Sequence, residues 1–182
     1  MNPRPQLPVT TRLQLREMCP ADIDWLDRLN SDADVMRYLG GPASRASTEQ
    51  MLSGRILRYY DEHPGLGVWA TVERSSGAVL GFHLLNHIRG EAYIQVGYRL
   101  FREAWGQGYA TEMARALLDY GFDSLGLAQI VAITDLGNVG SQRVLIKSGL
   151  QRRGEKSFAD PAYAGFGPLA WFEASAGHRP PR

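Results

Sequence analysis

The sequence is short of cysteine, of long apolar runs and of net charge, and each shortage excludes a class of protein. Its one cysteine, Cys19, cannot form a disulfide within the chain, and no His or acidic pair beside it resembles an activated thiolate. The formal net charge of +1 argues against a broad basic surface for nucleic acid. No apolar run is long enough to span a bilayer, and no cleavable leader opens the chain. These features predict a cytoplasmic protein with no membrane or nucleic-acid partner.

Two common phosphate-binding motifs are missing from the glycine-rich turn at residues 105–112. This turn reads Trp-Gly-Gln-Gly-Tyr-Ala-Thr-Glu. No Lys-Ser or Lys-Thr pair follows its glycines, as a P-loop requires, and Thr111 stands where a Rossmann turn needs a third glycine. The turn therefore belongs to neither of these classes.

The surroundings of this turn nevertheless favour an anion site. A strand-like segment rich in aromatic and β-branched residues, 93–100, precedes the turn, and an amphipathic helix pattern follows it. Gly106 and Gly108 leave the backbone unshielded where the helix presents its free N–H groups, which suits a phosphate or pyrophosphate. The alternative is that the glycines only let the helix pack closely on the sheet.

A second strand–helix unit follows at residues 129–149. Residues 129–134 form an apolar, β-branched run, and the helical pattern after them passes through Ser141. Asn138 is a natural N-cap for this helix, and Gly149 is a natural residue for its C-terminal stop.

The remaining sequence predicts further strands and helices around these two units. Strands are expected at residues 12–18, 67–73, 79–86, 150–154 and 166–172, and helices after Pro20 and over residues 48–60. No repeat or linker divides these elements. We therefore expect one mixed α/β domain over residues 11–173, with a loose lead-in at residues 1–10 and a mobile tail at residues 174–182.

Together these segments resemble the GNAT superfamily of acyl-CoA-dependent N-acetyltransferases, and within it the Rim-type branch that acetylates the N-termini of ribosomal proteins. The residues that carry the resemblance follow the family's order: residues 11–16, 97–100 and 105–112, then Asn138, Ser141, Arg143, Val144, Lys147 and Gly149. The resemblance implies a single-domain α/β (α+β) GNAT fold. In that fold a mixed and largely antiparallel central sheet splays at the cofactor site and is flanked by helices.

In that family the glycine-rich turn wraps the pyrophosphate of coenzyme A, so the resemblance implies acetyl-CoA as the co-substrate and no metal. The implied cofactor-binding residues are Trp105, Gly106, Gln107, Gly108, Tyr109, Ala110 and Thr111 in the turn, Tyr98 and Leu100 on the strand before it, and Asn138 and Arg143 at the later helix. Trp105 departs from the Arg or Gln usual at the first position of the signature, a departure shared with Rim-type members. Backbone N–H groups carry most of the binding at such a turn, so the departure need not abolish it.

The catalytic groups depart further from the family's pattern. Many GNAT enzymes carry a Glu base on the strand before the turn, but the matching position here holds Gln95. Glu91 on the same strand, and His83 and His87 on one face of the neighbouring strand, are the candidate bases, and a purely structural role is the alternative for each histidine. Leu145 replaces the Tyr that serves as the acid in many members, which leaves Ser141 as the candidate on the acid side.

A weak base suits one class of acceptor better than another. An α-amino group has a pKa near 7.7–8.0 against roughly 10.4 for lysine, so about a tenth of an α-amine is already neutral at pH 7. We therefore expect direct attack of a protein or peptide N-terminal α-amine on acetyl-CoA in a ternary complex, by a monomer or homodimer. Two alternatives stay open: acetylation of a small amine such as a polyamine, aminoglycoside or amino acid, and a non-catalytic module that only binds acyl-CoA.

Overall fold

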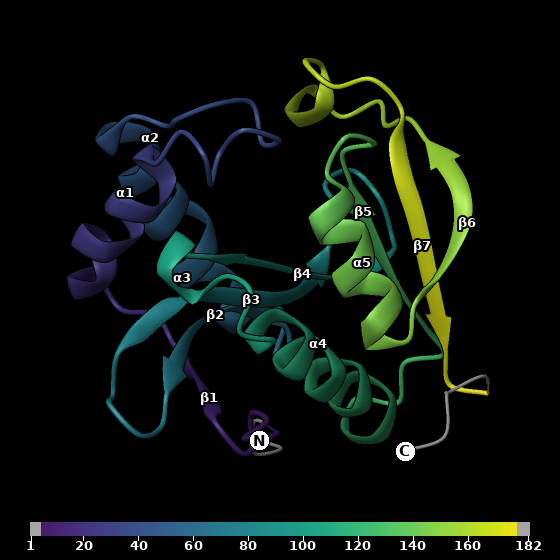
Figure 1. Ribbon diagram of the computed structural model, residues 1–182, viewed down its shortest axis with the longest axis horizontal. Coiled ribbons are helices and arrows are strands. Elements are labelled where there is room, and N and C mark those ends of the chain that lie inside the picture. The colour runs from purple at the N-terminus through teal and green to yellow at the C-terminus, as the bar shows by residue number, and fades with distance from the viewer. Residues whose placement is uncertain (1–4, 178–182) are drawn as a thin grey trace.

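The computed structural model describes residues 5–177, which form one seven-stranded sheet flanked by helices (Figure 1). The sheet order is β1-β2-β3-β4-β5-β7-β6. Its strands are β1 (Leu13–Glu17), β2 (Gly67–Glu73), β3 (Val79–His87), β4 (Ile94–Leu100), β5 (Gln129–Thr134), β6 (Gln151–Lys156) and β7 (Leu169–Ser175). Neighbouring strands are antiparallel except β4 and β5, which are parallel. The expected mixed and largely antiparallel sheet is confirmed.

Within the described residues, five α-helices connect the strands. They are α1 (Ile23–Ser31), α2 (Arg45–Met51), α3 (Leu57–Glu62), α4 (Tyr109–Asp119) and α5 (Val139–Ser148). Short 3₁₀ turns lie at Pro20–Asp22, Arg102–Ala104 and Pro161–Tyr163, and π-helical turns lie at Leu52–Ile56 and Tyr120–Ser124. Helices α4 and α5 contact each other and lie side by side in front of the sheet in Figure 1. No helix in the described part of the chain is both long and apolar enough to cross a bilayer.

Alternation along β3 and β4 shows which helices cover each face of the sheet. His83 and Tyr98 are cross-strand partners, and their side chains contact a backbone carbonyl of α4 and Ser141 of α5, respectively. Arg99, the next residue along β4, therefore points to the opposite face, where it donates a hydrogen bond to Asn30 of α1. We call these two sides the α4/α5 face and the α1 face.

Apolar side chains at helical spacing hold the helices on the sheet, as the sequence pattern predicts. Helix α4 buries Met113, Leu117 and Leu118, and helix α1 buries Leu26 and Leu29. Full burial of each such side chain is worth about 1.5–3 kcal/mol relative to exposure. The two helices are thereby fixed to the sheet on either side of β4.

Strands β4 and β5 are paired only briefly and then diverge. Among the described residues their one registered pair joins Gln95 to Val131, whereas β3 and β4 stay paired over seven residue pairs. The backbone of β4 beyond Val96 therefore faces no strand on its β5 side. This separation is the splay that the resemblance implied.

The helix expected over residues 48–60 is longer than expected. It begins at Arg45, because Ser44 caps it by accepting the Ser47 N–H, and it passes through the π-helical turn before it ends at Glu62.

The C-terminal strand also extends beyond its expected end. Strand β7 continues through Ser175, and Ala174 and Ser175 pair with Ile130 and Gln129 of β5. The sheet therefore includes two residues that were expected to lie in the mobile tail. Residues 1–4 of the lead-in and 178–182 of the tail lie outside the described residues.

Candidate active site

A cavity of about 1080 Å³ lies where β4 and β5 separate. Both strands line it, together with the glycine-rich turn, the start of α5 and the connection between α1 and α2. A Cβ atom on Gly137 would lie 3.3 Å from the Tyr38 ring, so the α1–α2 connection reaches across to the β5–α5 loop. All of the predicted cofactor-binding residues except Gln107 line this cavity.

The turn before α4 forms an open cradle. Gly106 and Gly108 have φ angles of +73° and +81°, in the left-handed region that glycine adopts most readily. A Cβ atom at Gly106 would meet no protein atom within 4 Å, and one at Gly108 would meet the Arg12 guanidinium at 3.5 Å. The glycines therefore do not serve to bring α4 close to the sheet, which excludes that alternative.

Backbone N–H groups at the start of α4 find no acceptor among the described residues. Gly108 is the N-cap and has no side chain to offer, and the first bond into the helix runs from Glu112 N to Gly108 O. The N–H groups of residues 109–111 are thus left for a ligand, and the helix dipole adds partial positive charge there. The cradle fits the pyrophosphate of coenzyme A through its backbone alone.

Contacts from β1 and β4 fix this turn in place. Arg12 donates from Nε to Glu112 Oε2 at 2.7 Å and from Nη1 to the Gln107 carbonyl at 3.0 Å, so Glu112 has a structural role. The Gln107 side chain donates its Nε2–H to the Glu103 carbonyl at 2.7 Å, and Gln107 does not line the cavity. Trp105 donates its indole N–H to the Leu100 carbonyl at 2.8 Å and remains 49% exposed beside the cavity.

The start of α5 brings further polar groups to the cavity. Asn138 caps the helix by accepting the Ser141 N–H at Oδ1 (3.1 Å), as the sequence predicts, and its Nδ2 has no acceptor among the described residues. Tyr98 Oη lies 3.0 Å from Ser141 O and 3.1 Å from Ser141 Oγ. Burial raises the pKa of Tyr98 to about 12, so the phenol is protonated at neutral pH and acts as a donor. Arg143 lines the same wall and is exposed.

His83, one of the predicted bases, lies beneath α4 rather than in the cavity. It is fully buried, with Nδ1 2.7 Å from Thr71 Oγ1 and Nε2 3.4 Å from Ala110 O. Burial lowers its pKa to about 3, so the imidazole is neutral. Strand alternation does not show that α4 covers this residue. His87, four residues later, is also absent from the cavity lining, and its Nδ1 lies 2.6 Å from Tyr59 Oη. The structure gives His83 no access to a substrate and a structural role instead.

Glu91, another of the predicted bases, does not lie on β4, which begins at Ile94, but in the turn between β3 and β4. It is absent from the cavity lining. Its carboxylate lies 3.7 Å from the Nζ of Lys156, which is placed over the rings of Tyr93 (4.2 Å) and Trp171 (4.7 Å). Glu91 therefore pairs with a lysine outside the cavity. The prediction that Glu91 serves as the base is wrong, because its side chain does not reach the active site.

The usual base position is polar but neutral. Gln95 lines the cavity from the α1 face and donates its Nε2–H to Asn86 Oδ1 at 3.3 Å. A carboxamide does not take up a proton at neutral pH, but its oxygen can accept a hydrogen bond from an amine. The side chain is therefore suited to orienting an acceptor amine rather than to deprotonating it.

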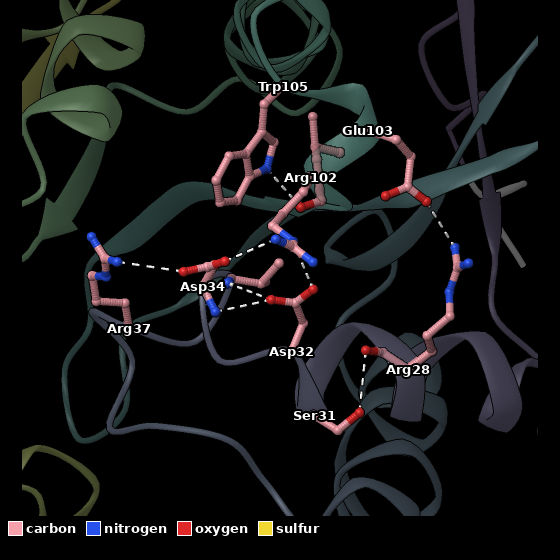
Figure 2. Close-up of polar contacts among 10 residues, drawn as sticks. Arg28, Ser31, Asp32, Asp34, Arg37, Arg102, Glu103 and Trp105 are labelled. Atoms are coloured by element: carbon pink, nitrogen blue, oxygen red, sulfur yellow. Dashed lines mark hydrogen bonds and ion pairs between the residues drawn. The ribbon is translucent and has the colours of Figure 1, made fainter.

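The two carboxylates that line the cavity are already engaged. Asp135 Oδ1 accepts the Gly137 N–H at 2.7 Å. Figure 2 shows the Arg102 guanidinium between Asp32 and Asp34, with Nε and Nη1 each 2.9 Å from a carboxylate oxygen. These pairs tie the α1–α2 connection to the 3₁₀ turn before the cradle. In residues 5–177, no three His, Cys, Asp or Glu side chains gather into a group that could hold a metal ion.

A sequence model described as an acetyltransferase (GNAT) domain matches residues 12–151. The chain belongs to the GNAT acetyltransferase family. Related proteins include the uncharacterized protein YkkB of Bacillus subtilis, 33% identical over 82% of this chain and 87% of its own length. The uncharacterized N-acetyltransferase YoaA of the same species is 33% identical over 80% of this chain and 82% of its own. The spermidine N(1)-acetyltransferase of Escherichia coli is 25% identical over 82% and 78%, respectively.

Solved GNAT structures share the fold. An acetyltransferase from Agrobacterium tumefaciens has a TM-score of 0.79 at 23% identity and covers 96% of both chains. A putative ribosomal-protein-serine acetyltransferase from Vibrio cholerae has a TM-score of 0.74 at 23% identity, covering 96% of this chain and 99% of its own. At these identities the likeness shows the fold alone.

Membership of the GNAT family makes the protein an acyl-CoA-dependent N-acyltransferase with acetyl-CoA as co-substrate and an amine as acceptor. The sequence predicted the glycine-rich turn and the start of α5, because the residues that form each of them are contiguous in the chain. The side chain of Tyr98 was not expected to meet Ser141, since no local pattern links residues so far apart.

Proposed function

We propose that this GNAT enzyme acetylates the α-amine at the N-terminus of a protein or peptide, by direct attack of the neutral amine on acetyl-CoA in a ternary complex. The observation that carries the proposal is the neutral base position. Gln95 stands there, and neither His83 nor Glu91 lines the cavity. An α-amine with a pKa near 8 needs little deprotonation at neutral pH, whereas a lysine-like amine with a pKa near 10.4 needs a base.

The charges around the cavity favour an acceptor with few positive charges. A polyamine or aminoglycoside presents several ammonium groups, which are best matched by unpaired carboxylates. Asp34 and Asp135, the carboxylates that line the cavity, are engaged in the contacts described above. The E. coli relative named as a spermidine acetyltransferase keeps a polyamine as the second candidate, and the V. cholerae neighbour named for a ribosomal protein is in line with the first.

Each step of the proposed reaction has a group in the cavity. Gln95 Oε1 accepts a hydrogen bond from the neutral amine and directs its lone pair at the thioester carbonyl. As the C–N bond forms and the C–S bond breaks, the Ser141 hydroxyl donates a proton toward the departing sulfur, and Tyr98 returns one to Ser141. The proton lost by the amine passes to water in the cavity and from that water to Tyr98, which lines the cavity, so both hydroxyls are restored and no phenolate remains.

Thiol release from acetyl-CoA tests the proposal. The panel contains four kinds of acceptor. They are peptides with a free N-terminus, peptides with a blocked N-terminus and an internal lysine, spermidine, and an aminoglycoside. We expect turnover with free N-termini and loss of turnover when they are blocked. A higher kcat/KM with spermidine or the aminoglycoside would overturn the proposed acceptor.

The direct mechanism has its own control. Cys19 is exposed and is absent from the cavity lining, so Cys19→Ala is expected to keep full turnover. Loss of turnover in this variant with unchanged coenzyme A affinity would indicate an acyl-enzyme instead.

A further inference from the structure

Arg99 is a half-buried cation without a counter-ion, and its Nε atom is buried. It lies four residues after Gln95 on the same face of β4 and lines the cavity. Burial lowers the pKa of its guanidinium to about 10, so the group stays charged at neutral pH. No carboxylate among the described residues forms an ion pair with it.

The hydrogen bonds of Arg99 are also incomplete. Its Nη1 donates to Asn30 Oδ1, and the Phe82 ring lies beside the guanidinium with its centroid 5.1 Å from Cζ. Its Nε is buried with no acceptor, and Nη2 has none in the part of the chain that the structure describes. A buried charged donor in this state is unfavourable unless a partner completes it.

Other arginines at this side of the cavity are satisfied by the protein. Arg102 bridges Asp32 and Asp34, and Arg37 lies 3.4 Å from Asp34 (Figure 2). Both are exposed, and both have carboxylate partners within the chain. Arg99 differs in its burial and in its missing partner, which is the pattern of a ligand-binding arginine rather than of a surface ion pair.

The position of Arg99 indicates which substrate supplies the partner. The phosphate cradle and the start of α5 lie on the α4/α5 face, whereas Arg99 points to the α1 face. The phosphates of coenzyme A are therefore on the other side of the strand. The α1 face is therefore the side of the cavity that is left for the acceptor. The planar fork of a guanidinium matches the two oxygens of a carboxylate.

We propose that Arg99 binds a carboxylate on a side chain near the N-terminus of the acceptor peptide, so that the enzyme selects acidic N-terminal segments. Four residues of strand span roughly 13 Å between the Cα atoms of Gln95 and Arg99. An Asp or Glu side chain in the first residues of a peptide covers such a span. An α-carboxylate on the same carbon as the amine does not. The inference rests on the proposed function and narrows its acceptor.

Peptide pairs that differ in one charge test this inference. One pair has aspartate or asparagine as its second residue, another has glutamate or glutamine as its third, and kcat/KM is measured by thiol release. In at least one pair, we expect the wild-type kcat/KM to be higher for the peptide with the carboxylate than for its amide counterpart, by on the order of 10- to 100-fold. Arg99→Gln, which keeps a donor for Asn30, is expected to reduce the preference to within about threefold. Arg37→Gln is the matched control and is expected to retain it.

The outcomes separate this inference from the proposed function. Equal turnover of both members of each pair by the wild type would overturn the inference and leave the proposed function intact. A preference that survives in Arg99→Gln would overturn the role of Arg99. Two further results would overturn the proposal that the carboxylate belongs to a peptide. One is a free amino acid with a higher kcat/KM than both peptides, and the other is succinyl-CoA with a higher kcat/KM than acetyl-CoA, if in either case the advantage is lost in Arg99→Gln.

A binding measurement decides the case in which no peptide turns over. The N-acetylated forms of the same pairs are titrated into the enzyme–coenzyme A complex, and their dissociation constants are compared. A carboxylate preference that disappears in Arg99→Gln would support the inference even then. Equal or undetectable binding of both members would overturn it.

Discussion

The two sides of the gap between β4 and β5 offer different kinds of recognition. On the α4/α5 face the cradle presents backbone N–H groups, opened by Gly106 and Gly108. On the α1 face the groups are side chains, among them Gln95, held by the neighbouring strand β3, and Arg99, held by the distant helix α1. A backbone site depends on the shape of one turn, whereas a side-chain site depends on which residues stand at each position. This difference explains how GNAT enzymes can share a co-substrate while their acceptors vary.

The largest expected effect comes from closing the cradle. Gly108→Val forces a β-branched residue to φ +81° and places a side chain where the pyrophosphate approaches, so coenzyme A affinity is expected to fall more than about 100-fold. Titration calorimetry with coenzyme A measures it. Gly77→Val is the matched control, because Gly77 has φ +75° and open space but lies in the β2–β3 turn. Unchanged affinity in Gly108→Val would contradict the assignment of the cradle.

The acid side of the reaction is tested at the contact between Tyr98 and Ser141. Ser141→Ala is expected to lower kcat by on the order of 100-fold without weakening coenzyme A, because the cap of α5 uses the backbone N–H of Ser141 and not its hydroxyl. Tyr98→Phe is expected to act similarly. If the two hydroxyls form one relay, the double variant loses no more than either single one. Additive losses would show that they act separately.

A third prediction concerns the buried histidine beneath the cradle. His83 has a pKa of about 3 in the folded protein against about 6.5 when unfolded, so the unfolded state binds the extra proton between these values. Stability is therefore lost as the pH falls below about 6.5, by about 2 kcal/mol at pH 5. Urea denaturation at pH 7 and pH 5 is expected to show a smaller difference in His83→Gln. The partly exposed His63, changed to Gln, is the control, and an equal effect there would argue against a buried neutral His83.

The smallest expected effect comes from the ion pairs of Arg102 with the α1–α2 connection. Arg102→Gln breaks exposed ion pairs, each worth about 0–1 kcal/mol, so the acceptor KM is expected to rise about two- to fivefold with little change for acetyl-CoA. The difference should shrink at high salt. Arg28→Gln breaks an equally exposed pair with Glu103 that does not involve the α1–α2 connection, and it is expected to leave KM unchanged (Figure 2). An equal rise in both variants would assign the effect to general surface charge.

The contrast between the two sides also explains what the sequence could predict. The cradle and the cap at Asn138 depend on glycines and short polar residues at fixed local positions, and the structure has both. Strand alternation grouped His83 with His87 as residues that could line a cleft, but it gave no information about depth, and neither residue lines the cavity. The end of a strand is equally hard to read, and Glu91 lies outside β4 because the chain turns before Ile94.

The residues on the acceptor side could not be predicted from local sequence patterns, because their positions depend on tertiary contacts. The partner of Arg99 on α1 is Asn30, which lies 69 residues earlier in the chain. Nothing near Arg99 in the sequence indicates that it is half-buried or that no carboxylate accompanies it. Such a residue is recognised only when its surroundings are assembled.

The enclosure of Lys156 has a consequence for the protein's own amines. Thioesters acylate exposed lysines spontaneously, and this chain has two lysines, Lys147 and Lys156. The ammonium of Lys156 is covered by the rings of Tyr93 and Trp171 and flanked by Glu91. Lys147 is thus the more open of the two to accidental self-modification. Because Lys147 also lines the cavity, acylation of the protein by its own bound thioester is expected at Lys147 rather than at Lys156.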